Sequence, residues 1–141
     1  GGASSAMAYA VIHPEKVHGV VAMGMCDLLA RLEFARQSCN PILRNLATCV
    51  FAAYGGTPEE LPRPYRARSV LAHHDRLTMP IVLTMGEKDA LIPVVETRKI
   101  AAAMRERANF AYHEVPMGNH DSALWVDVDL QTVRLRNRHE D

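Results

Sequence analysis

The sequence predicts an α/β fold, a three-layer αβα sandwich in which a parallel sheet lies between helices. Two segments, 17–23 and 80–85, are nearly continuous apolar runs, which is typical of strands covered on both faces. A third segment, 109–115, alternates more between apolar and polar residues and is expected nearer to a sheet edge. Helical segments separate the three strands, and such connections imply parallel pairing with right-handed crossovers.

The segments around the first strand are expected to be helical. Residues 4–13 are mostly small, and they predict a helix that ends before Pro14 and lies close to the sheet. Leucines recur at helical spacing within 27–54, in two pieces that Asn40 and Pro41 separate. We therefore expect two helices between the first and second strands.

Further helices are expected along the rest of the chain. The turn 55–60 contains Thr57 and Glu60 at the spacing of a capping box, so it is expected to lead into a helix. Residues 94–107 carry apolar side chains along one stripe and charged ones off it, which is typical of an amphipathic helix. A more weakly patterned segment, 122–136, predicts a closing helix.

Length and composition limit the classes of function. The 141 residues suit a single domain, and 48% apolar with 23% charged residues is typical of a globular protein. The 16 basic and 16 acidic residues balance, which disfavours nucleic acid and anionic membranes as partners. No apolar run reaches the roughly 20 residues of a membrane-spanning helix.

The three cysteines do not suggest a disulfide framework or a metal site. Cys26, Cys39 and Cys49 are odd in number and lack the C-x-x-C spacing, so free thiols are expected. Neither a metal nor another cofactor is expected. No basic-then-apolar leader is visible, and the chain is expected to begin inside a fold. Localisation therefore stays open, with the cytoplasm slightly favoured.

Two side chains that suit acid–base chemistry follow predicted strands. Asp89 comes four residues after the second strand, and His120 comes five residues after the third. Because the carboxyl ends of parallel strands meet at one sheet edge, the two side chains are expected within several ångströms of each other. A carboxylate that accepts the Nδ1–H of a histidine fixes its tautomer, as in a hydrolytic triad. Taken singly, Asp89 could be a turn residue and His120 an exposed loop histidine.

A serine near the start of the chain is the expected nucleophile. Gly2 and Ala6, two residues to either side of Ser4, are small enough for the close strand–helix approach around a nucleophile turn. The backbone N–H of Ser5 is the expected oxyanion donor, because the residue after the nucleophile normally supplies one. The alternative is that Ser4 is only the N-cap of the first helix.

With these residues in place, the sequence resembles the C-terminal half of an α/β-hydrolase of the prolyl oligopeptidase-like and related esterase branch. The order serine, aspartate, histidine is that of the α/β-hydrolases. The turn around Ser4 is similar to their Gly-x-Ser-x-Gly, with Ala6 in place of the second glycine. Residues 55–93, with a strand, a Gly-x-x-Asp turn and an Ile-Pro continuation, carry the most specific resemblance. Asn119 departs from it, because a glycine or another small residue is common before the histidine.

The resemblance implies a partial α/β-hydrolase domain over 1–141, with 27–54 as a helical lid-like insertion. It implies Ser4 as nucleophile, Asp89 as triad acid and His120 as general base. The expected reaction is hydrolysis of a small-molecule carboxylic ester through an acyl-serine intermediate. The expected substrate-pocket residues are apolar side chains of the lid, namely Leu28, Leu32, Phe34 and Phe51.

The resemblance also implies that part of the sheet is missing. The family has five strands before the nucleophile, and an early loop that donates the other oxyanion N–H. We therefore expect an open edge on the first strand, and little or no activity unless a missing N-terminal half or a second copy of the chain completes the sheet. Two alternatives stay open: a serine peptidase of the same branch, and a non-catalytic fragment that acts as an assembly or binding module.

Overall fold

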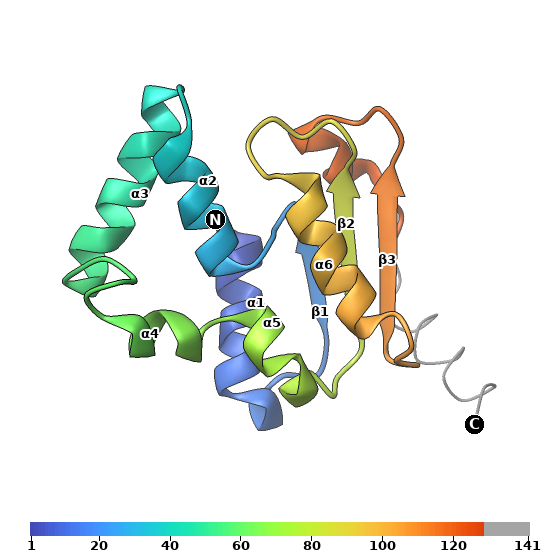
Figure 1. Cartoon of the computed structure of the whole chain (residues 1–141). Helices are drawn as coiled ribbons and strands as arrows, with labels where there is room; N and C mark the ends of the chain where they lie inside the picture. Colours follow the sequence, from blue (N-terminus) through green and yellow to red (C-terminus); the bar gives the residue numbers. More distant parts are fainter. Residues whose placement is uncertain (129–141) are drawn as a thin grey trace.

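The computed structural model describes residues 1–128, as a parallel three-stranded sheet flanked by helices (Figure 1). This architecture confirms the predicted α/β fold class. The elements follow in the order α1 (Gly2–Ile12), η1 (Pro14–Lys16), β1 (Val20–Met23), α2 (Leu28–Gln37), α3 (Pro41–Tyr54), α4 (Pro62–Ala67), α5 (Val70–His73), η2 (His74–Arg76), β2 (Ile81–Gly86), α6 (Val94–Met104), β3 (Phe110–Val115) and η3 (His120–Trp125), where η denotes a 3₁₀ helix.

The sheet has the strand order β1–β2–β3, with both pairs parallel as predicted. The central strand β2 is buried along its whole length, whereas β3 becomes more exposed toward its end, as suits a sheet edge. The first strand is shorter than predicted and begins at Val20, whose N–H donates to the carbonyl of Pro80. Residues before Val20 have no partner on β2, because β2 itself begins only after Pro80.

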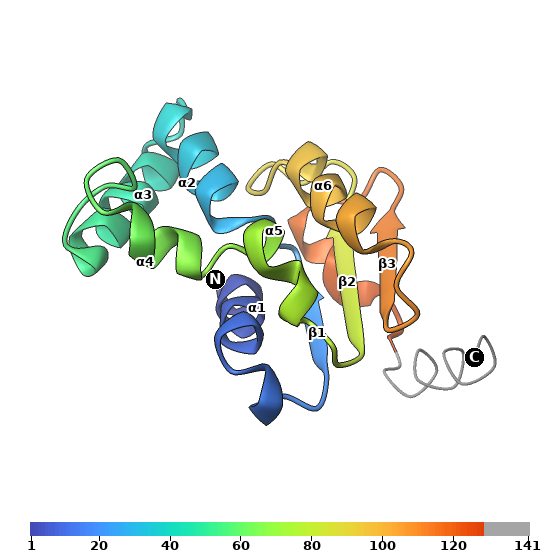
Figure 2. The ribbon, with the colours of Figure 1, turned by 60° about the horizontal axis from the view of Figure 1, so that its bottom comes forward.

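One face of the sheet carries the main hydrophobic core. The helices α1, α5 and α6 cover this face (Figures 1 and 2), and α1 approaches β1 closely because it presents small side chains. The core includes Met7, Ala10 and Val11 from α1, Val20 and Ala22 from β1, Val70 from α5, Ile81 and Leu83 from β2, and Ile100 and Met104 from α6. On the opposite face, the Thr84 hydroxyl donates to the carbonyl of Ala123 at 2.8 Å, which fixes η3 against β2.

The helices α2 and α3 form a hairpin to one side of the sheet (Figure 1). Asn40 caps α3 by accepting the N–H of Ile42 at 2.9 Å, and Pro41 occupies the first helical turn. The hairpin has a core of its own, built from Leu32, Ala35, Leu43, Ala47 and the α4 residue Tyr65. The two predicted helices are therefore present, and their role as a lid stays a prediction.

Two expectations about helix boundaries were wrong. Thr57 and Glu60 exchange the hydrogen bonds of a capping box, but residues 58–60 form a turn and the next helix begins only at Pro62. The predicted closing helix over 122–136 is not present up to residue 128, because the chain forms the 3₁₀ helix η3 and then leaves helical structure. The remainder of that segment, 129–136, lies outside the described residues.

None of the helices within residues 1–128 is long and apolar enough to cross a membrane.

Gly86, the last residue of β2, allows the loop after β3 to cross directly over the strand end. A Cβ atom at this position would overlap the carbonyl oxygen of Asn119 and lie 2.7 Å from that of Gly118. These neighbours are backbone atoms, so they could move away only if the whole loop moved. The absence of a side chain at Gly86 therefore sets the position of the residues that lead into η3.

We expect Gly86→Ala to lower the free energy of unfolding by about 3 kcal/mol, because the added methyl group meets backbone rather than a flexible side chain. Urea unfolding followed by circular dichroism measures the change. Gly2→Ala is the matched control, since a Cβ there has no neighbour within 4 Å. Its stability should equal or exceed that of the wild type because alanine favours a helix. Equal stability of Gly86→Ala and wild type would contradict the steric argument.

Candidate active site

Asp89 and His120 lie at the carboxyl edge of the parallel sheet. Asp89 is in the loop after β2, and His120 begins η3 after β3. The two loops are joined by backbone hydrogen bonds, because Glu87 N–H donates to the carbonyl of Val115 at 3.0 Å and Lys88 N–H donates to that of Gly118 at 2.7 Å. The spacing of both residues from their strand ends thus placed them at one edge, as the sequence predicts.

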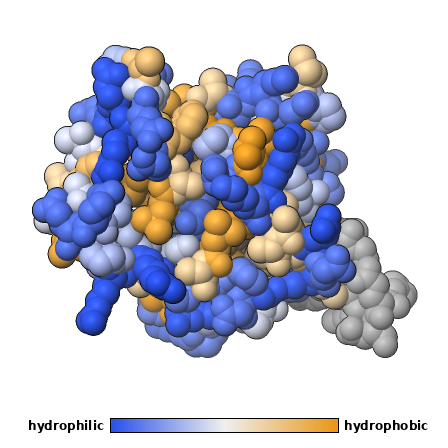
Figure 3. Space-filling view, in the orientation of Figure 1, coloured by the Kyte–Doolittle hydropathy of each residue, from blue (hydrophilic) through white to orange (hydrophobic). Residues whose placement is uncertain are grey.

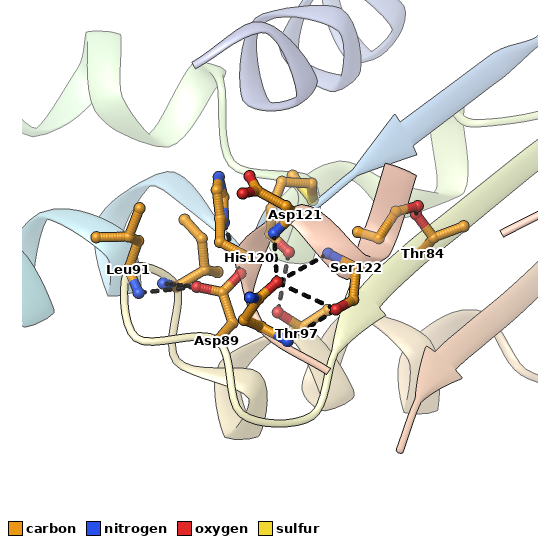
Figure 4. Close-up of polar contacts among 11 residues, drawn as sticks. Thr84, Asp89, Leu91, Thr97, His120, Asp121 and Ser122 are labelled. Atoms are coloured by element: carbon orange, nitrogen blue, oxygen red, sulfur yellow. Dashed lines mark hydrogen bonds and ion pairs between the residues drawn. The ribbon is translucent and has the colours of Figure 1, made fainter. Parts of the chain in front are cut away.

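The carboxylate of Asp89 is fully buried and contacts the His120 ring directly (Figure 4). Its Oδ2 lies 2.6 Å from Nδ1 of His120, and its Oδ1 accepts the N–H groups of Leu91 and Ile92, both at 2.8 Å. A carboxylate oxygen needs a donor opposite it, so this geometry assigns the proton to Nδ1 and leaves Nε2 as the basic nitrogen. The His120 side chain is 40% exposed.

Asn119 anchors the turn that carries His120. Its Oδ1 accepts the N–H groups of Asp121 and Ser122, and the Ser122 hydroxyl in turn accepts the N–H of Asn119 at 2.9 Å. This reciprocal capping box begins η3 at His120. The departure from the family pattern at Asn119 therefore has a local structural explanation.

Gly24 leaves room for the imidazole of His120. This residue follows β1 with a φ of 72°, and a Cβ there would lie 3.2 Å from Cε1 of His120. A side chain at Gly24 would thus meet both a strained backbone conformation and the ring itself. The sequence shows Gly24 only as the end of a strand, and its contact with His120 becomes visible only in the folded chain.

Ser4 lines the same pocket as His120. The pocket has a volume of about 150 Å³, and Gly1, Gly2, Arg31 and Leu91 are also among its lining residues. Ser4 lies in the first turn of α1 and is half-buried, and within residues 1–128 it makes no hydrogen bond to His120. Ser4 lies within α1, which begins at Gly2, and it has no positive φ; its role as nucleophile stays a prediction.

The role of Ser5 as oxyanion donor stays a prediction, and its N–H is engaged in this structure. Its backbone N–H already donates to the carbonyl of Gly1 at 3.2 Å, within the first turn of α1. The Ser5 hydroxyl donates to the same carbonyl at 3.3 Å. Because α1 begins at Gly2, the carbonyl of Gly1 is the first acceptor of the helix and takes up this N–H.

Of the four predicted substrate-pocket residues, the structure brings only Leu28 beside Ser4. Leu28 and Ser4 both line a pocket of about 300 Å³, together with Tyr54. In Figure 3, apolar surface gathers in the middle of the molecule, between the α2–α3 hairpin and the side of α6. All four candidates also contact the hairpin's own core, in which Leu32 is buried and against which Leu28, Phe34 and Phe51 pack.

A two-helix hairpin must bury an apolar stripe between its helices, and the pocket role of these four residues stays a prediction. Leu32, Phe34 and Phe51 supply that stripe, and their apolar character alone does not reveal which side of the hairpin they face. The sequence reasoning also missed Tyr9, Tyr54 and Arg68 in the pocket of about 300 Å³. No sequence motif distinguishes these three residues from ordinary surface positions.

A larger pocket of about 690 Å³ lies between α6 and β3, far from this pair. It is lined mainly by arginine, alanine and aromatic side chains, and none of its lining residues within 1–128 is a serine, threonine or cysteine. Because it lacks a nucleophile beside an acid–base pair, we take the smaller pocket with Ser4 and His120 as the candidate active site.

Similarity to solved structures supports the fold. The chain matches a puromycin-hydrolyzing peptidase from Mycobacterium tuberculosis with a TM-score of 0.62 and 21% identity, over 94% of this chain and 19% of that protein. It matches a puromycin hydrolase with a TM-score of 0.61 and 19% identity, over 99% of this chain and 19% of that protein. A candidate dipeptidyl aminopeptidase IV from Bacteroides ovatus matches with a TM-score of 0.57 and 17% identity, over 99% of this chain and 17% of that protein.

These proteins have the α/β-hydrolase fold, and at such identities the likeness establishes fold alone. The chain therefore has the fold of the C-terminal part of an α/β-hydrolase, as predicted from its strands and from the acid and histidine loops. It spans about a fifth of the length of these solved structures, namely 19%, 19% and 17% of their chains. No family model and no curated protein matches the sequence.

Asp89→Asn should change the tautomer of His120. The new amide can keep the hydrogen bonds to Leu91 and Ile92 through its oxygen and turn its NH₂ toward Nδ1, which moves the ring proton to Nε2. Imidazole ¹⁵N spectra at about pH 8 distinguish the two neutral tautomers. Glu15→Gln is the control, because it removes a carboxylate 3.9 Å from His13 and should leave the His120 signals unchanged. An unchanged tautomer in Asp89→Asn would refute the assigned proton position.

The three thiols should differ sharply in reactivity. Burial raises the pKa of Cys26 to about 12, whereas Cys39 and Cys49 are exposed. The thiolate is the reactive form, so Ellman's reagent at about pH 8 should modify two thiols rapidly and Cys26 at least about a hundredfold more slowly. Removing both exposed cysteines should abolish the fast phase, and urea should release the slow one. Three equally fast thiols would contradict the burial of Cys26.

Proposed function

We propose that this chain carries the catalytic residues of a serine hydrolase of the peptidase kind, with Ser4 as nucleophile, His120 as general base and Asp89 as the residue that orients His120. One observation carries the proposal: the fully buried Asp89 carboxylate binds Nδ1 of His120 at 2.6 Å, and Ser4 lines the pocket into which the ring is exposed. The order of the three residues along the chain adds support.

The proposed mechanism uses both nitrogens of His120. Nε2 takes the proton of the Ser4 hydroxyl as Oγ attacks the substrate carbonyl, and Asp89 stabilises the imidazolium that forms. His120 then gives this proton to the leaving amine, so that the C–N bond breaks and an acyl ester on Ser4 remains. Water attacks the ester with His120 again as base, which releases the acid and restores the serine.

Amide substrates are favoured over the carboxylic esters expected from the sequence. The similar solved structures are described as a puromycin-hydrolyzing peptidase, a puromycin hydrolase and a candidate dipeptidyl aminopeptidase IV. The similarity to these structures therefore supports the peptidase alternative, and no comparable similarity supports ester hydrolysis. A peptide or aminoacyl amide bond is the substrate class that we propose.

Efficient amide hydrolysis is proposed only for a protein in which further strands complete the sheet. The N–H of Ser5 donates to Gly1, and the chain spans only about a fifth of its structural neighbours. An oxyanion donor would then come from chain that lies outside this sequence, and removing such a donor typically costs about 10²–10³ in rate. The present chain alone is expected to react with an activated probe but to turn over amides poorly.

A second candidate function follows from β1. Within the described residues, β1 pairs with β2 on one side only, so its other edge offers backbone groups to a further strand. A second copy of the chain could pair there, and the protein would then act as an assembly module.

Labelling with a fluorophosphonate tests the proposed nucleophile. We expect modification at Ser4, mapped by peptide mass spectrometry, and at least about a hundredfold slower labelling in His120→Gln, because the serine then lacks its base. Ser4→Ala should abolish the label and Ser5→Ala should retain it, so the two adjacent serines serve as matched variants.

Unchanged labelling of Ser4→Ala would refute Ser4 as the nucleophile. Sedimentation of the unlabelled chain separates the second candidate, since a stable dimer without any labelling supports assembly. In a preparation with a complete sheet, faster hydrolysis of an aminoacyl p-nitroanilide than of p-nitrophenyl acetate, relative to the uncatalysed rates, supports the peptidase reading.

A further inference from the structure

Arg31 lines the pocket that Ser4 and His120 share. It lies on the first turn of α2, and its backbone N–H donates to the carbonyl of Asp27 at 2.9 Å. The side chain reaches from the hairpin to the sheet edge and stands in the same hollow as Leu91 and Ile92, the residues whose N–H groups hold Asp89. The hairpin therefore contributes one cationic group to the candidate active site.

Within residues 1–128, no hydrogen bond or ion pair of the Arg31 guanidinium is found. Its Nη1 is buried and makes no hydrogen bond within the described part of the chain, and none of the ion pairs found there includes Arg31. A buried donor without an acceptor costs free energy, and more so when it is charged. Such a group is a candidate for binding an acceptor that arrives from outside.

Two other arginines of the chain have carboxylate partners. Arg36, one turn and a half further along α2, makes a two-pronged contact with Glu59 at 2.9 and 3.2 Å. Arg98 binds Glu114 in the same way, at 2.9 and 2.7 Å. Arg31 differs from both in its missing counter-ion and in its place beside the candidate nucleophile.

The charges around Arg31 do not neutralise it. Burial lowers the pKa of its guanidinium, while attraction to Cys26 and Asp89 opposes this effect. The Cys26 thiol is uncharged at neutral pH, because its own pKa is raised to about 12. The Asp89 carboxylate is already engaged by His120, Leu91 and Ile92. A carboxylate from the substrate would supply the missing charge and up to two hydrogen-bond acceptors.

We propose that Arg31 is a specificity-determining residue that binds a carboxylate of the substrate beside Ser4 and His120. The proposal deepens the proposed peptidase function and rests on it. The carboxylate has two sources: an acidic side chain on the acyl side of the scissile bond, or the free C-terminus of a short peptide on the leaving side. Both offer the same planar, two-oxygen acceptor to a guanidinium.

The size of the pocket limits the group that can enter. Its volume of about 150 Å³ corresponds to roughly five water molecules at the ~30 Å³ that each occupies in the liquid. A carboxylate with one or two methylene groups fits this space. The structure therefore favours a short acidic group such as the side chain of aspartate or a terminal glycine.

Binding of small ligands to the 141-residue chain tests the proposal without any need for turnover. Two pairs are compared by NMR titration of the backbone amide signals of Leu91 and Ile92, which line the pocket and are present in every variant: N-acetyl-aspartic amide against N-acetyl-asparagine amide, and N-acetylglycine against N-acetylglycinamide. At least one acid should bind about tenfold more tightly than its neutral amide, and the pair that shows the preference identifies the source of the carboxylate. Arg31→Met should abolish the preference and Arg31→Lys should retain part of it.

Two control variants separate this inference from the proposed function. Arg36→Gln removes a neighbouring arginine of the same helix and should leave the preference unchanged. Ser4→Ala should also keep it, so a chain that is never labelled at Ser4 can still show the carboxylate site. A fluorophosphonate-reactive chain without any preference for acids refutes the site but not the nucleophile.

Stability supplies a further readout. Removing an unpaired, partly buried charge should not destabilise the fold, so Arg31→Met is expected to melt at or above the temperature of the wild type. A loss of several degrees would indicate that Arg31 has a structural partner, and would overturn the proposal. Equal affinity for acids and amides in the wild type, or a preference that survives in Arg31→Met, would overturn it as well.

Discussion

The buried carboxylate of Asp89 is the group on which the arrangement of the candidate site depends. Two of its three hydrogen bonds come from backbone N–H groups of its own loop, Leu91 and Ile92, so the direction of the carboxylate is fixed locally. Its remaining oxygen then admits His120 in one orientation only, with Nδ1 toward the acid. A buried carboxylate without these donors would be costly to maintain. The hydrogen bond that orients the His120 ring thus also gives the buried Asp89 carboxylate a donor.

This contact exists because three strand ends can approach one another closely. Gly86 lets the loop after β3 pass over β2, and Gly24 leaves space for the imidazole at the end of β1. The hydrogen bond from Lys88 N–H to the carbonyl of Gly118 joins the acid loop to the histidine loop. The α2–α3 hairpin adds Arg31 to the same edge. The ends of the three strands and the helix α2 therefore each contribute a residue to this edge of the sheet, and the two glycines allow these segments to lie close together.

Much of the fold could be predicted, since the three apolar runs, the helices between them and the loop positions of Asp89 and His120 follow from local patterns. The pocket could not be predicted in the same way. Leu32 and Phe51 have the apolar character of pocket residues, but the hairpin uses them for its own core. Arg31 has the character of a helix surface residue, yet its Nη1 is buried beside Ser4's pocket. Whether the N–H of Ser5 has an intrahelical acceptor depends on the residue at which α1 begins, and the residue pattern does not determine that residue.

The sequence by itself determined where three candidate side chains lie relative to the strands: a serine before the first strand, an acid after the second and a histidine after the third. This is possible because strand periodicity and parallel crossovers dictate the edge at which each loop must emerge. Only the tertiary structure decided which groups share a pocket, which donors are already engaged and which charge stays unpaired. These properties depend on distances between segments far apart in the chain, and such distances are set by packing rather than by local pattern.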